Sequence, residues 1–295
     1  NGYVNDLFYK NGELGNWWYY DGSDWYFFKD GKKLTGYGKD NSGEKYFVNG
    51  KYANGEYLGK LYSNGLLVSN ISSNNVTIKQ FSGKKLADIS QHNGYIDFSK
   101  LKNEVDGVII RVGYGTDAED KRWRANVRGA INNGIPYGFY WYSYALNETH
   151  AKQEAAMFLN AIKGYKPEYP IYIDMEDADY WKQKQGSHHI ANTWLGREKI
   201  IRTHIDAYEK AGYFGGVYAS RSWFDAMNDL SRYARWVAHW TENPNTYKNT
   251  NYGMHQYTAK GKANGVKGDL DLNISHIDYP SIIKNGGFNN WKIAN

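Results

Sequence analysis

Carboxylate residues follow apolar runs at several points of this 295-residue chain, and these are the side chains whose type and spacing could carry chemistry. The apolar run 170–173 leads into Asp174 and Glu176, another ends in Asp88, and Asp269 opens a later one. A buried carboxylate is costly unless it is paired or used, so an apolar segment that ends in acids is a poor core and a good site. We therefore predict Glu176, Asp174, Asp88 and Asp269 as catalytic residues.

Asp174 and Glu176 are two residues apart, so on a strand they face the same side with Cα atoms roughly 6.5–7 Å apart. Two carboxylates at about 7 Å repel by roughly 2.4 kcal/mol at an effective dielectric of about 20. That is worth about 1.7 pKa units, which keeps one acid protonated near pH 6 if it is also partly desolvated. A proton-donating acid beside a charged carboxylate suits glycoside hydrolysis, although the same pair also fits a solvated strand end or a metal ligand.

The elements that must position these acids alternate between short apolar strands and amphipathic helices. The strands are expected at 86–90, 107–112, 136–144, 170–175, 216–219, 235–240, 254–257 and 269–272, and the helices at 123–133, 148–162, 195–211 and 222–230. Eight strands with intervening helices predict an α/β fold, an irregular (β/α) TIM-like barrel whose chemistry lies at the carboxyl ends of the strands. A doubly wound open sheet is the alternative, but no glycine-rich phosphate loop follows a strand.

The first 80 residues have a different composition, with 17 aromatic residues, 12 glycines and no proline. Asn-Gly or Asp-Gly follows an aromatic residue at Gly12, Gly31, Gly50 and Gly65, which are 19, 19 and 15 residues apart. Such pairs favour type I′ turns, so the segment predicts an array of β-hairpins that bury aromatic rings between neighbours. We predict a small all-β hairpin-repeat module over residues 1–80, a linker at about 70–85, and a catalytic domain over 86–295.

Composition excludes several classes of protein. The chain has no cysteine, which excludes disulfides, thiol nucleophiles and cysteine-ligated zinc. No apolar run approaches the roughly 18 residues of a membrane span, and no export signal is expected at the start. The net charge of +5 and the 17% aromatic content favour a carbohydrate or polyanionic partner. Nucleic acid is discounted, because nine lysines face eight acidic residues in the first 80 positions.

The second domain carries a series of motifs in a recognisable order. They are DISQHNGYIDF at 88–98, GVIIRV at 107–112, GIPYGFYWY at 134–142, YIDME at 172–176, WVAHW at 236–240, HQY at 255–257 and GDLDLN at 268–273. This order and spacing resemble glycoside hydrolase family 25, the muramidase-type lysozymes of bacteria and phages, from about residue 86 to about 283. The resemblance implies a β/α barrel that hydrolyses the β-1,4 bond between N-acetylmuramic acid and N-acetylglucosamine, with no metal and no cofactor.

The resemblance also implies roles for the acids. Glu176 would be the general acid, and Asp174 would stabilise the acetamido group of the sugar in a substrate-assisted reaction. Asp88 and Asp269 would line the same groove, and Asp271 could take the place of Asp269. Asp88 as a nucleophile remains the alternative mechanism.

Further residues are predicted to bind substrate. Gln256 would form a hydrogen bond near the site, and Arg111, which lies within an apolar strand, needs a buried partner, with a groove acid preferred over direct substrate contact. Four aromatic residues near strand ends could stack on sugar rings or fill the barrel: Tyr140, Tyr142, Tyr218 and Trp240.

The stretch 16–36 resembles the cell-wall-binding repeats of the choline-binding and glucan-binding type. The resemblance implies attachment to peptidoglycan, wall polysaccharide or teichoic acid, and the candidate ligand-binding rings are Trp17, Trp18, Trp25 and Tyr26. In the alternative interpretation these aromatic residues are only the core of a small β domain. We expect a monomer that is secreted to the bacterial wall or released from a phage-infected host.

Two other functions remain open. A non-catalytic wall-binding protein on a barrel scaffold would have a broken set of acids, and this chain has all four. A chitinase-like hydrolase would carry the motif Asp-x-x-Asp-x-Asp-x-Glu, but Tyr169 and Tyr172 occupy the first two acid positions. The adjacent pair His188 and His189 has no third ligand at suitable spacing, so we predict no metal site.

Overall fold

The structure, a computed structural model, describes residues 2–20, 25–40, 43–53, 55–57, 60–63, 65–70, 83–116, 118–228, 230–248, 250 and 252–292. The chain divides into two compact units, residues 1–80 with 228–232 and residues 81–227 with 233–295. Most of the expected linker, residues 71–82, lies outside the described residues. No helix in the described ranges is both long enough and apolar enough to cross a lipid bilayer.

The first unit contains four small antiparallel sheets of three strands each. The hairpin turns have the predicted geometry, because Asn11 and Gly12, like Asp30 and Gly31, all have positive φ. The predicted hairpins are therefore confirmed at these turns, whereas Asn64 of the fourth lies outside the described residues. The strands are β1 (Gly2–Val4), β2 (Leu7–Lys10), β3 (Glu13–Leu14), β4 (Trp18–Tyr20), β5 (Trp25–Lys29), β6 (Lys32–Lys33), β7 (Gly36–Asp40), β8 (Gly43–Val48), β9 (Lys51–Tyr52), β10 (Gly55–Tyr57), β11 (Lys60–Ser63) and β12 (Leu66–Asn70).

Successive hairpins join through backbone hydrogen bonds and stacked rings. The amide of Phe8 donates to the carbonyl of Gly31, and the amide of Phe27 donates to that of Gly50, each at 2.8 Å. Phe27 stacks on Phe47 with ring centroids 4.4 Å apart, and Phe47 is fully buried. Each hairpin thus buries its aromatic face against the next, as expected of a repeat array.

The second unit is built on eight strands that close into a barrel, in the order β13-β14-β16-β17-β18-β19-β20-β21 and back to β13. Two-residue strand β15 (Ala118–Glu119) pairs with β14 at the edge. All eight predicted strands are present. They are β13 (Lys84–Ile89), β14 (Gly107–Tyr114), β16 (Tyr137–Tyr142), β17 (Ile171–Asp174), β18 (Gly215–Ser220), β19 (Ala234–Ala238), β20 (Met254–Gly261) and β21 (Leu270–Ser275).

The mixed α/β fold is confirmed, but the barrel is only loosely TIM-like. The barrel strands β13, β14 and β16 to β20 run parallel, whereas β21 is antiparallel to both β20 and β13. No helix lies between β20 and β21, so the chain returns directly and the last strand points the opposite way. This reversal brings the start of β21, rather than its end, to the mouth of the barrel.

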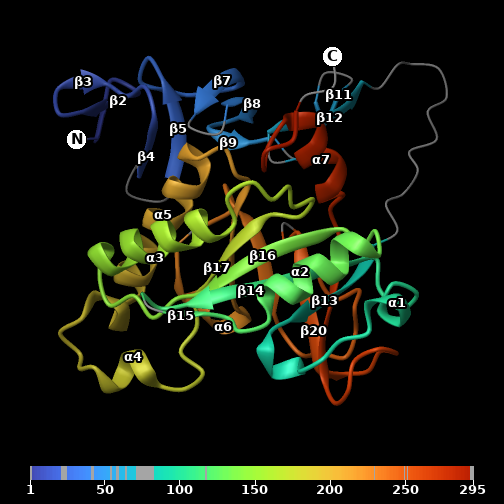
Figure 1. Cartoon of the computed structure of the whole chain (residues 1–295). Helices are drawn as coiled ribbons and strands as arrows, with labels where there is room; N and C mark the ends of the chain where they lie inside the picture. Colours follow the sequence, from blue (N-terminus) through green and yellow to red (C-terminus); the bar gives the residue numbers. More distant parts are fainter. Residues whose placement is uncertain are drawn as a thin grey trace. The chain divides into compact units, whose positions relative to one another are not determined.

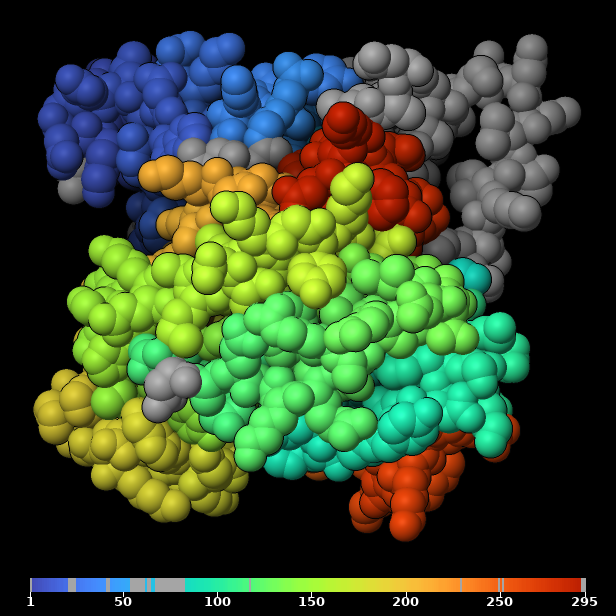
Figure 2. All heavy atoms as spheres, in the orientation of Figure 1, coloured from blue at the N-terminus to red at the C-terminus, as the bar shows by residue number. Residues whose placement is uncertain are grey.

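Helices cover the outside of the barrel. Figure 1 shows α3 and α5 side by side, with α2 along the wall formed by β14 and β16. In Figure 2 the green segments that include α2 and α3 form much of the surface on this side of the unit. Asn147 and Thr193 cap α3 and α5 through their side-chain oxygens. The helices are α1 (Phe98–Leu101), α2 (Trp123–Asn132), α3 (Glu148–Ala161), α4 (Trp181–Lys184), α5 (Trp194–Lys210), α6 (Arg221–Ala226) and α7 (Tyr279–Gly286), with 3-10 turns η1 (Gln91–Asn93) and η2 (Ile190–Asn192).

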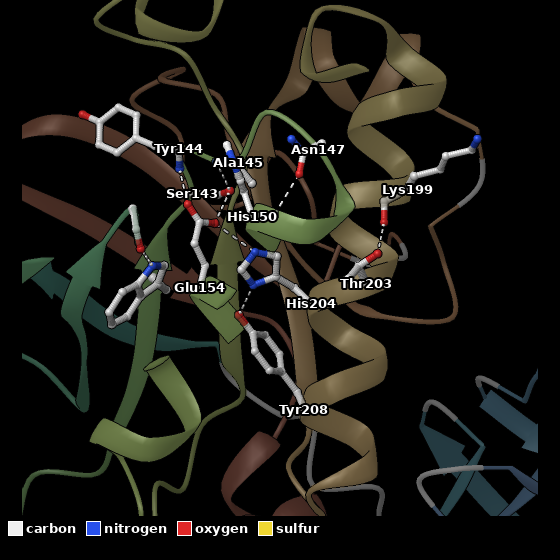
Figure 3. Close-up of polar contacts among 12 residues, drawn as sticks. Ser143, Tyr144, Ala145, Asn147, His150, Glu154, Lys199, Thr203, His204 and Tyr208 are labelled. Carbon is white, nitrogen blue, oxygen red and sulfur yellow. Dashed lines mark hydrogen bonds and ion pairs between the residues drawn. The ribbon is translucent and has the colours of Figure 1, made fainter. Parts of the chain in front are cut away.

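A buried polar network joins α3 and α5 to the end of β16 (Figure 3). The carboxylate of Glu154 accepts hydrogen bonds from Ser143 Oγ at 2.7 Å and from the amide of Tyr144 at 2.8 Å. His204 Nε2 lies 3.0 Å from the same carboxylate, and its Nδ1 lies 2.9 Å from the hydroxyl of Tyr208. Glu154 and His204 are fully buried, so this network supplies the polar partners that water cannot.

We expect Glu154→Leu to lower the free energy of unfolding by about 3–5 kcal/mol, because it leaves three polar groups without a partner in the protein interior. Urea denaturation followed by circular dichroism measures the change. Gln153→Leu, at an exposed position of the same helix, is the matched control and should change the free energy by less than about 0.5 kcal/mol. Equal effects of the two substitutions would contradict this role of the network.

Candidate active site

A cavity of about 350 Å³ lies at the mouth of the barrel, where the parallel strands have their carboxyl ends. It contains all four predicted catalytic acids and every predicted substrate-binding residue except Trp240. The cavity is lined by Asp88, Ser90, His92, Asn93, Arg111, Tyr140, Tyr142, Asp174, Glu176, Tyr218, Trp236, Gln256, Ala259, Asp269 and Asp271.

Alternation along the strands explains why these side chains meet. Asp174 pairs with Tyr142 on one neighbouring strand and with Tyr218 on the other, so the three side chains project to the same face of the sheet. Asp88 pairs with Asp271 across β13 and β21 in the same way. The inward positions near the strand ends therefore carry the carboxyl groups of the site.

Glu176 stands two residues beyond the end of β17, so the expectation that both acids of the pair lie on the strand is correct only for Asp174. Both still line the cavity. Burial, opposed by the charge of Lys182, raises the pKa of Glu176 to about 7. Burial first, and the charge of Glu176 second, raise the pKa of Asp174 well above its ordinary value. Desolvation is thus the larger cause, and repulsion between the two acids is the smaller one.

Lys182 is a fully buried cation that the sequence analysis did not identify. Its Nζ donates hydrogen bonds to the backbone carbonyls of Ser143 and Glu176, each at 2.5 Å. Its charge lowers the pKa of both Asp174 and Glu176. Lys182 therefore fixes the loop that carries the acid and limits how far burial raises the pKa of both groups.

Asp88 is the most heavily hydrogen-bonded acid of the site. Its Oδ2 accepts from Asn273 Nδ2 at 2.8 Å and from Gln256 Nε2 at 3.0 Å. A further hydrogen bond joins it to the carboxyl of Asp271, which lowers the pKa of Asp88 and raises that of Asp271. Burial and the charge of Asp88 bring the pKa of Asp271 to about 8, and burial also raises the pKa of Asp88, so the two carboxyl groups share a proton near neutral pH.

The structure separates Asp269 from Asp271. Asp269 lies at the exposed rim of the cavity and forms a 2.6 Å ion pair with Lys262, which lowers its pKa. Asp271 lies inside, against Asp88. The geometry thus favours Asp271 as the groove acid, the option that the sequence left open.

The predicted aromatic residues fall into two groups. Tyr140 and Tyr218 are buried in the barrel, in contact with the ring of Trp236. Trp240 is 62% exposed, and its Nε1 donates to Gln256 Oε1 at 2.9 Å. Gln256 Oε1 also accepts from the hydroxyl of Tyr218 at 3.1 Å. Gln256 therefore connects the exposed ring of Trp240 to Asp88, although Trp240 does not line the cavity itself.

Arg111 has the buried partner that its position demands, but this partner is not one of the groove acids. Its Nε donates to Asp120 Oδ2 at 3.0 Å, and Asp120 is buried. The same oxygen of Asp120 accepts from the amide of Gln91, so Asp120 also anchors the loop after β13. Arg111 also lines the cavity, and its Nη2 is buried without a hydrogen-bond partner. An oxygen atom of a bound substrate could accept a hydrogen bond from this Nη2.

Three residues of the site escaped the sequence analysis. Trp236 forms part of the cavity and donates Nε1 to Asn273 Oδ1 at 2.7 Å, which orients Asn273 toward Asp88. Strand alternation could have found Asn273, because it is two residues from Asp271 on the same face. The neighbouring residues do not predict that Lys182 is buried, because their pattern is typical of an exposed lysine.

The rings predicted to bind the wall have unequal exposure. Trp18 packs in the core of its unit with Phe27, so the expectation that it binds a ligand is wrong. The ring of Tyr26 is covered by the ammonium group of Lys33, 3.1 Å from its centroid. Trp17 is 36% exposed and Trp25 is half-buried, and these two remain candidates.

No group of three or more potential metal ligands occurs in the part of the chain that the structure describes.

The comparisons with known proteins agree with this geometry. Residues 87–266, more than half of the chain, match the family described as glycosyl hydrolases family 25. The chain belongs to this family. It is therefore a glycoside hydrolase of the lysozyme type.

Three relatives of this family 25 hydrolase are named. Lysozyme M1 of Streptomyces globisporus is 24% identical over 200 residues, covering 65% of this chain and 67% of that protein. The autolytic lysozyme of Clostridium acetobutylicum is 28% identical over 189 residues, covering 63% of this chain but only 53% of that protein. The modular autolysin LytC from Streptococcus pneumoniae is 27% identical with a TM-score of 0.57, covering 92% of this chain and 75% of that one, and it was also solved with a synthetic peptidoglycan ligand.

We expect Lys182→Met to move the alkaline limb of the pH–activity profile of this hydrolase to higher pH. Removing the cation raises the pKa of Glu176, and protonated Glu176 then persists to higher pH. Loss of the two carbonyl anchors should also lower kcat roughly 10- to 100-fold. Lys184→Met, an exposed lysine on the same helix, is the matched control. An alkaline limb that stays in place would show that Lys182 does not act on the acid.

Proposed function

We propose that the chain hydrolyses the β-1,4 bond between N-acetylmuramic acid and N-acetylglucosamine in peptidoglycan, with Glu176 as the general acid. The observation that carries the proposal is the buried Glu176 carboxyl, whose pKa is raised to about 7 in a cavity that holds further carboxylates. Such a group holds its proton up to neutral pH and can give it to a leaving oxygen. Family membership, relatives named as lysozymes and autolysins, and the peptidoglycan ligand solved with one of them support this substrate.

The proposed reaction is substrate-assisted. Glu176 protonates the glycosidic oxygen as the bond to C1 breaks, and the acetamido oxygen of the same sugar closes on C1. Asp174 accepts a hydrogen bond from the acetamido N–H, and this donor favours the ionised form of Asp174 against the effect of burial. Water then opens the ring intermediate while the Glu176 carboxylate takes its proton.

Asp88 is better suited to orientation than to attack. Two amide groups donate to one of its carboxylate oxygens, and the carboxyl of Asp271 shares a proton with it. A nucleophile needs a free lone pair directed at C1, and these contacts occupy and hold the Asp88 group. We infer that Asp88 and Asp271 act as one proton-sharing pair that fixes Gln256.

The remaining site residues are assigned to sugar contacts. The exposed ring of Trp240, held at its edge by Gln256, would stack on a sugar outside the cavity. Tyr142 is half-buried beside Asp174 and would contact the sugar at the cleaved bond. Arg111 would donate its unpartnered Nη2 to a sugar oxygen.

We also propose that the four hairpin repeats bind a wall polysaccharide or teichoic acid, with Trp17 and Trp25 as the contact rings. The 36% exposure of Trp17 and the half-buried position of Trp25, beside a core formed by Trp18, Phe27, Phe47 and Tyr52, support this assignment. A catalytic unit and a wall-binding unit on one chain suit a monomeric enzyme that acts on the bacterial wall from outside the cell, after secretion or after release at host lysis.

We expect Glu176→Gln to lower kcat on purified peptidoglycan by at least about 10²-fold, because the amide cannot donate the catalytic proton. The measurement is release of reducing ends, with mass spectrometry of the reduced products. Wild-type products should end in reduced N-acetylmuramic acid. Because burial raises the pKa of Glu176, the folded state loses stability as pH rises from about 4.5 to about 7, and the variant avoids this loss. Its melting temperature at pH 8 should therefore equal or exceed that of the wild type.

Glu148→Gln, exposed at the start of α3, is the control and should keep full activity. Products that end in reduced N-acetylglucosamine would reveal a glucosaminidase on this scaffold. Efficient cleavage of soluble chitin oligomers would support the chitinase-like alternative. A well-folded wild-type chain that releases nothing would leave only a wall-binding function.

A further inference from the structure

A second cavity, of about 440 Å³, lies beside the active site in the same unit. One of its lining residues, Asp177, directly follows Glu176, and another, Trp223, belongs to α6, which begins where β18 ends. Both elements leave the carboxyl end of the barrel, so this cavity lies at the same end as the catalytic acids. We call it the Arg197 pocket after its cationic residue.

Arg197 is held in a fixed orientation. Its guanidinium carbon lies 4.0 Å from the ring of Trp223 and 4.3 Å from that of Trp194, and its Nε donates to the carbonyl of Ala191 at 2.8 Å. Among the described residues, no carboxylate forms an ion pair with it and no acceptor meets its terminal nitrogens. The terminal N–H groups of Arg197 are therefore already oriented for a ligand. Because the guanidinium is half-buried, a hydrogen-bonded anion would stabilise it more than it would an exposed cation.

Among the described residues that line this pocket, the one acid, Asp177, cannot serve as this partner in full. Asp177 Oδ1 accepts the amide of Lys182 at 2.8 Å and Oδ2 accepts the amide of Gln183 at 3.0 Å, which caps α4. Asp177 is thus committed to the helix start. Its carboxylate lines the pocket without closing it.

Tyr180 provides a second, independent observation. It is a bulky residue in the left-handed region, with φ of 58°, and its ring is 63% exposed on the lining of the pocket. This conformation is strained for a residue with a Cβ. Strain of this kind persists where the surrounding structure holds it, commonly at ligand sites. Here the strained backbone of Tyr180 places its exposed ring on the lining of the pocket that Arg197 also lines.

We propose that the Arg197 pocket binds a free carboxylate of the peptide attached to the muramic acid of the strand being cleaved. The inference rests on the proposed function and extends it. N-acetylglucosamine is neutral, and the lactyl carboxyl of muramic acid is taken up in the amide bond to the peptide. The anionic groups that intact peptidoglycan presents near the cleaved bond are therefore the free carboxylates of the peptide. The active-site cavity, lined by acids, repels such groups, whereas the neighbouring guanidinium attracts them. The pocket volume lies within the range that small ligands occupy.

The test compares two substrates, intact peptidoglycan and glycan strands from which an amidase has removed the peptides and whose freed lactyl carboxyl groups have then been converted to amides. Arg197→Gln should lower kcat/KM on intact peptidoglycan about tenfold, mainly through KM, because a charge-assisted hydrogen bond is lost. On the peptide-free glycan the variant should match the wild type, which also shows that it is folded. Lys199→Gln, an exposed residue of the same helix with the same change of charge, should match the wild type on both substrates.

Equal losses on both substrates would overturn the proposal, because Arg197 would then support the fold or contact the sugar. No loss on either substrate would also overturn it.

A binding experiment separates this proposal from the proposed function. The tripeptide L-alanyl-γ-D-glutamyl-L-lysine is titrated into the full chain, and the indole signals of Trp194 and Trp223 are followed by NMR. Shifts in the wild type that become about tenfold weaker in Arg197→Gln, and that are absent with the fully amidated tripeptide, support the pocket even if no glycan is cleaved. Absence of shifts with the tripeptide, or equal shifts with inorganic phosphate, would overturn it and leave at most a general anion site.

Discussion

Desolvation of carboxyl groups at the mouth of the barrel is the constraint on which the rest of the site depends. Asp88, Asp174, Glu176 and Asp271 are held in one cavity of about 350 Å³, and burial is the first cause of the raised pKa of each. A fold can retain such groups only if protons, amide donors or a cation offset the loss of water. Here Asn273 and Gln256 supply the amide donors, Asp271 shares a proton with Asp88, and Lys182 supplies the cation.

The irregular topology of the barrel is part of this arrangement. In a fully parallel barrel each strand presents its last inward residue at the mouth. Because β21 runs in the opposite direction, it presents its beginning, and Asp271 comes directly opposite Asp88. Asn273, one inward position deeper in the barrel, donates a hydrogen bond to Oδ2 of Asp88. The antiparallel strand thus contributes both the proton-sharing partner and a hydrogen-bond donor.

Sequence patterns predicted the elements better than the interactions between them. The eight strands and the main helices follow from apolar periodicity, and the hairpin turns follow from Asn-Gly and Asp-Gly pairs that accept positive φ. The grouping of the acids also follows, since strand ends meet at one edge of a parallel barrel. The burial of Lys182, the ion pair of Arg111 with Asp120, and the burial of Trp18 depend on how loops and strands fold back on one another in three dimensions. A pattern of neighbouring residues carries no information about such contacts.

The central claim is that burial, rather than repulsion within the Asp174 and Glu176 pair, keeps the catalytic acid protonated. The most direct test is a titration of the chain with ¹³C-labelled glutamate carboxyl groups, followed by NMR, in which the signal lost in Glu176→Gln identifies Glu176. The structure predicts that this signal titrates near pH 7, and that it still titrates well above 4.5 when Asp174 is replaced by Asn. A midpoint near 4.5 in the wild type, or a fall to that value in Asp174→Asn, would contradict the claim.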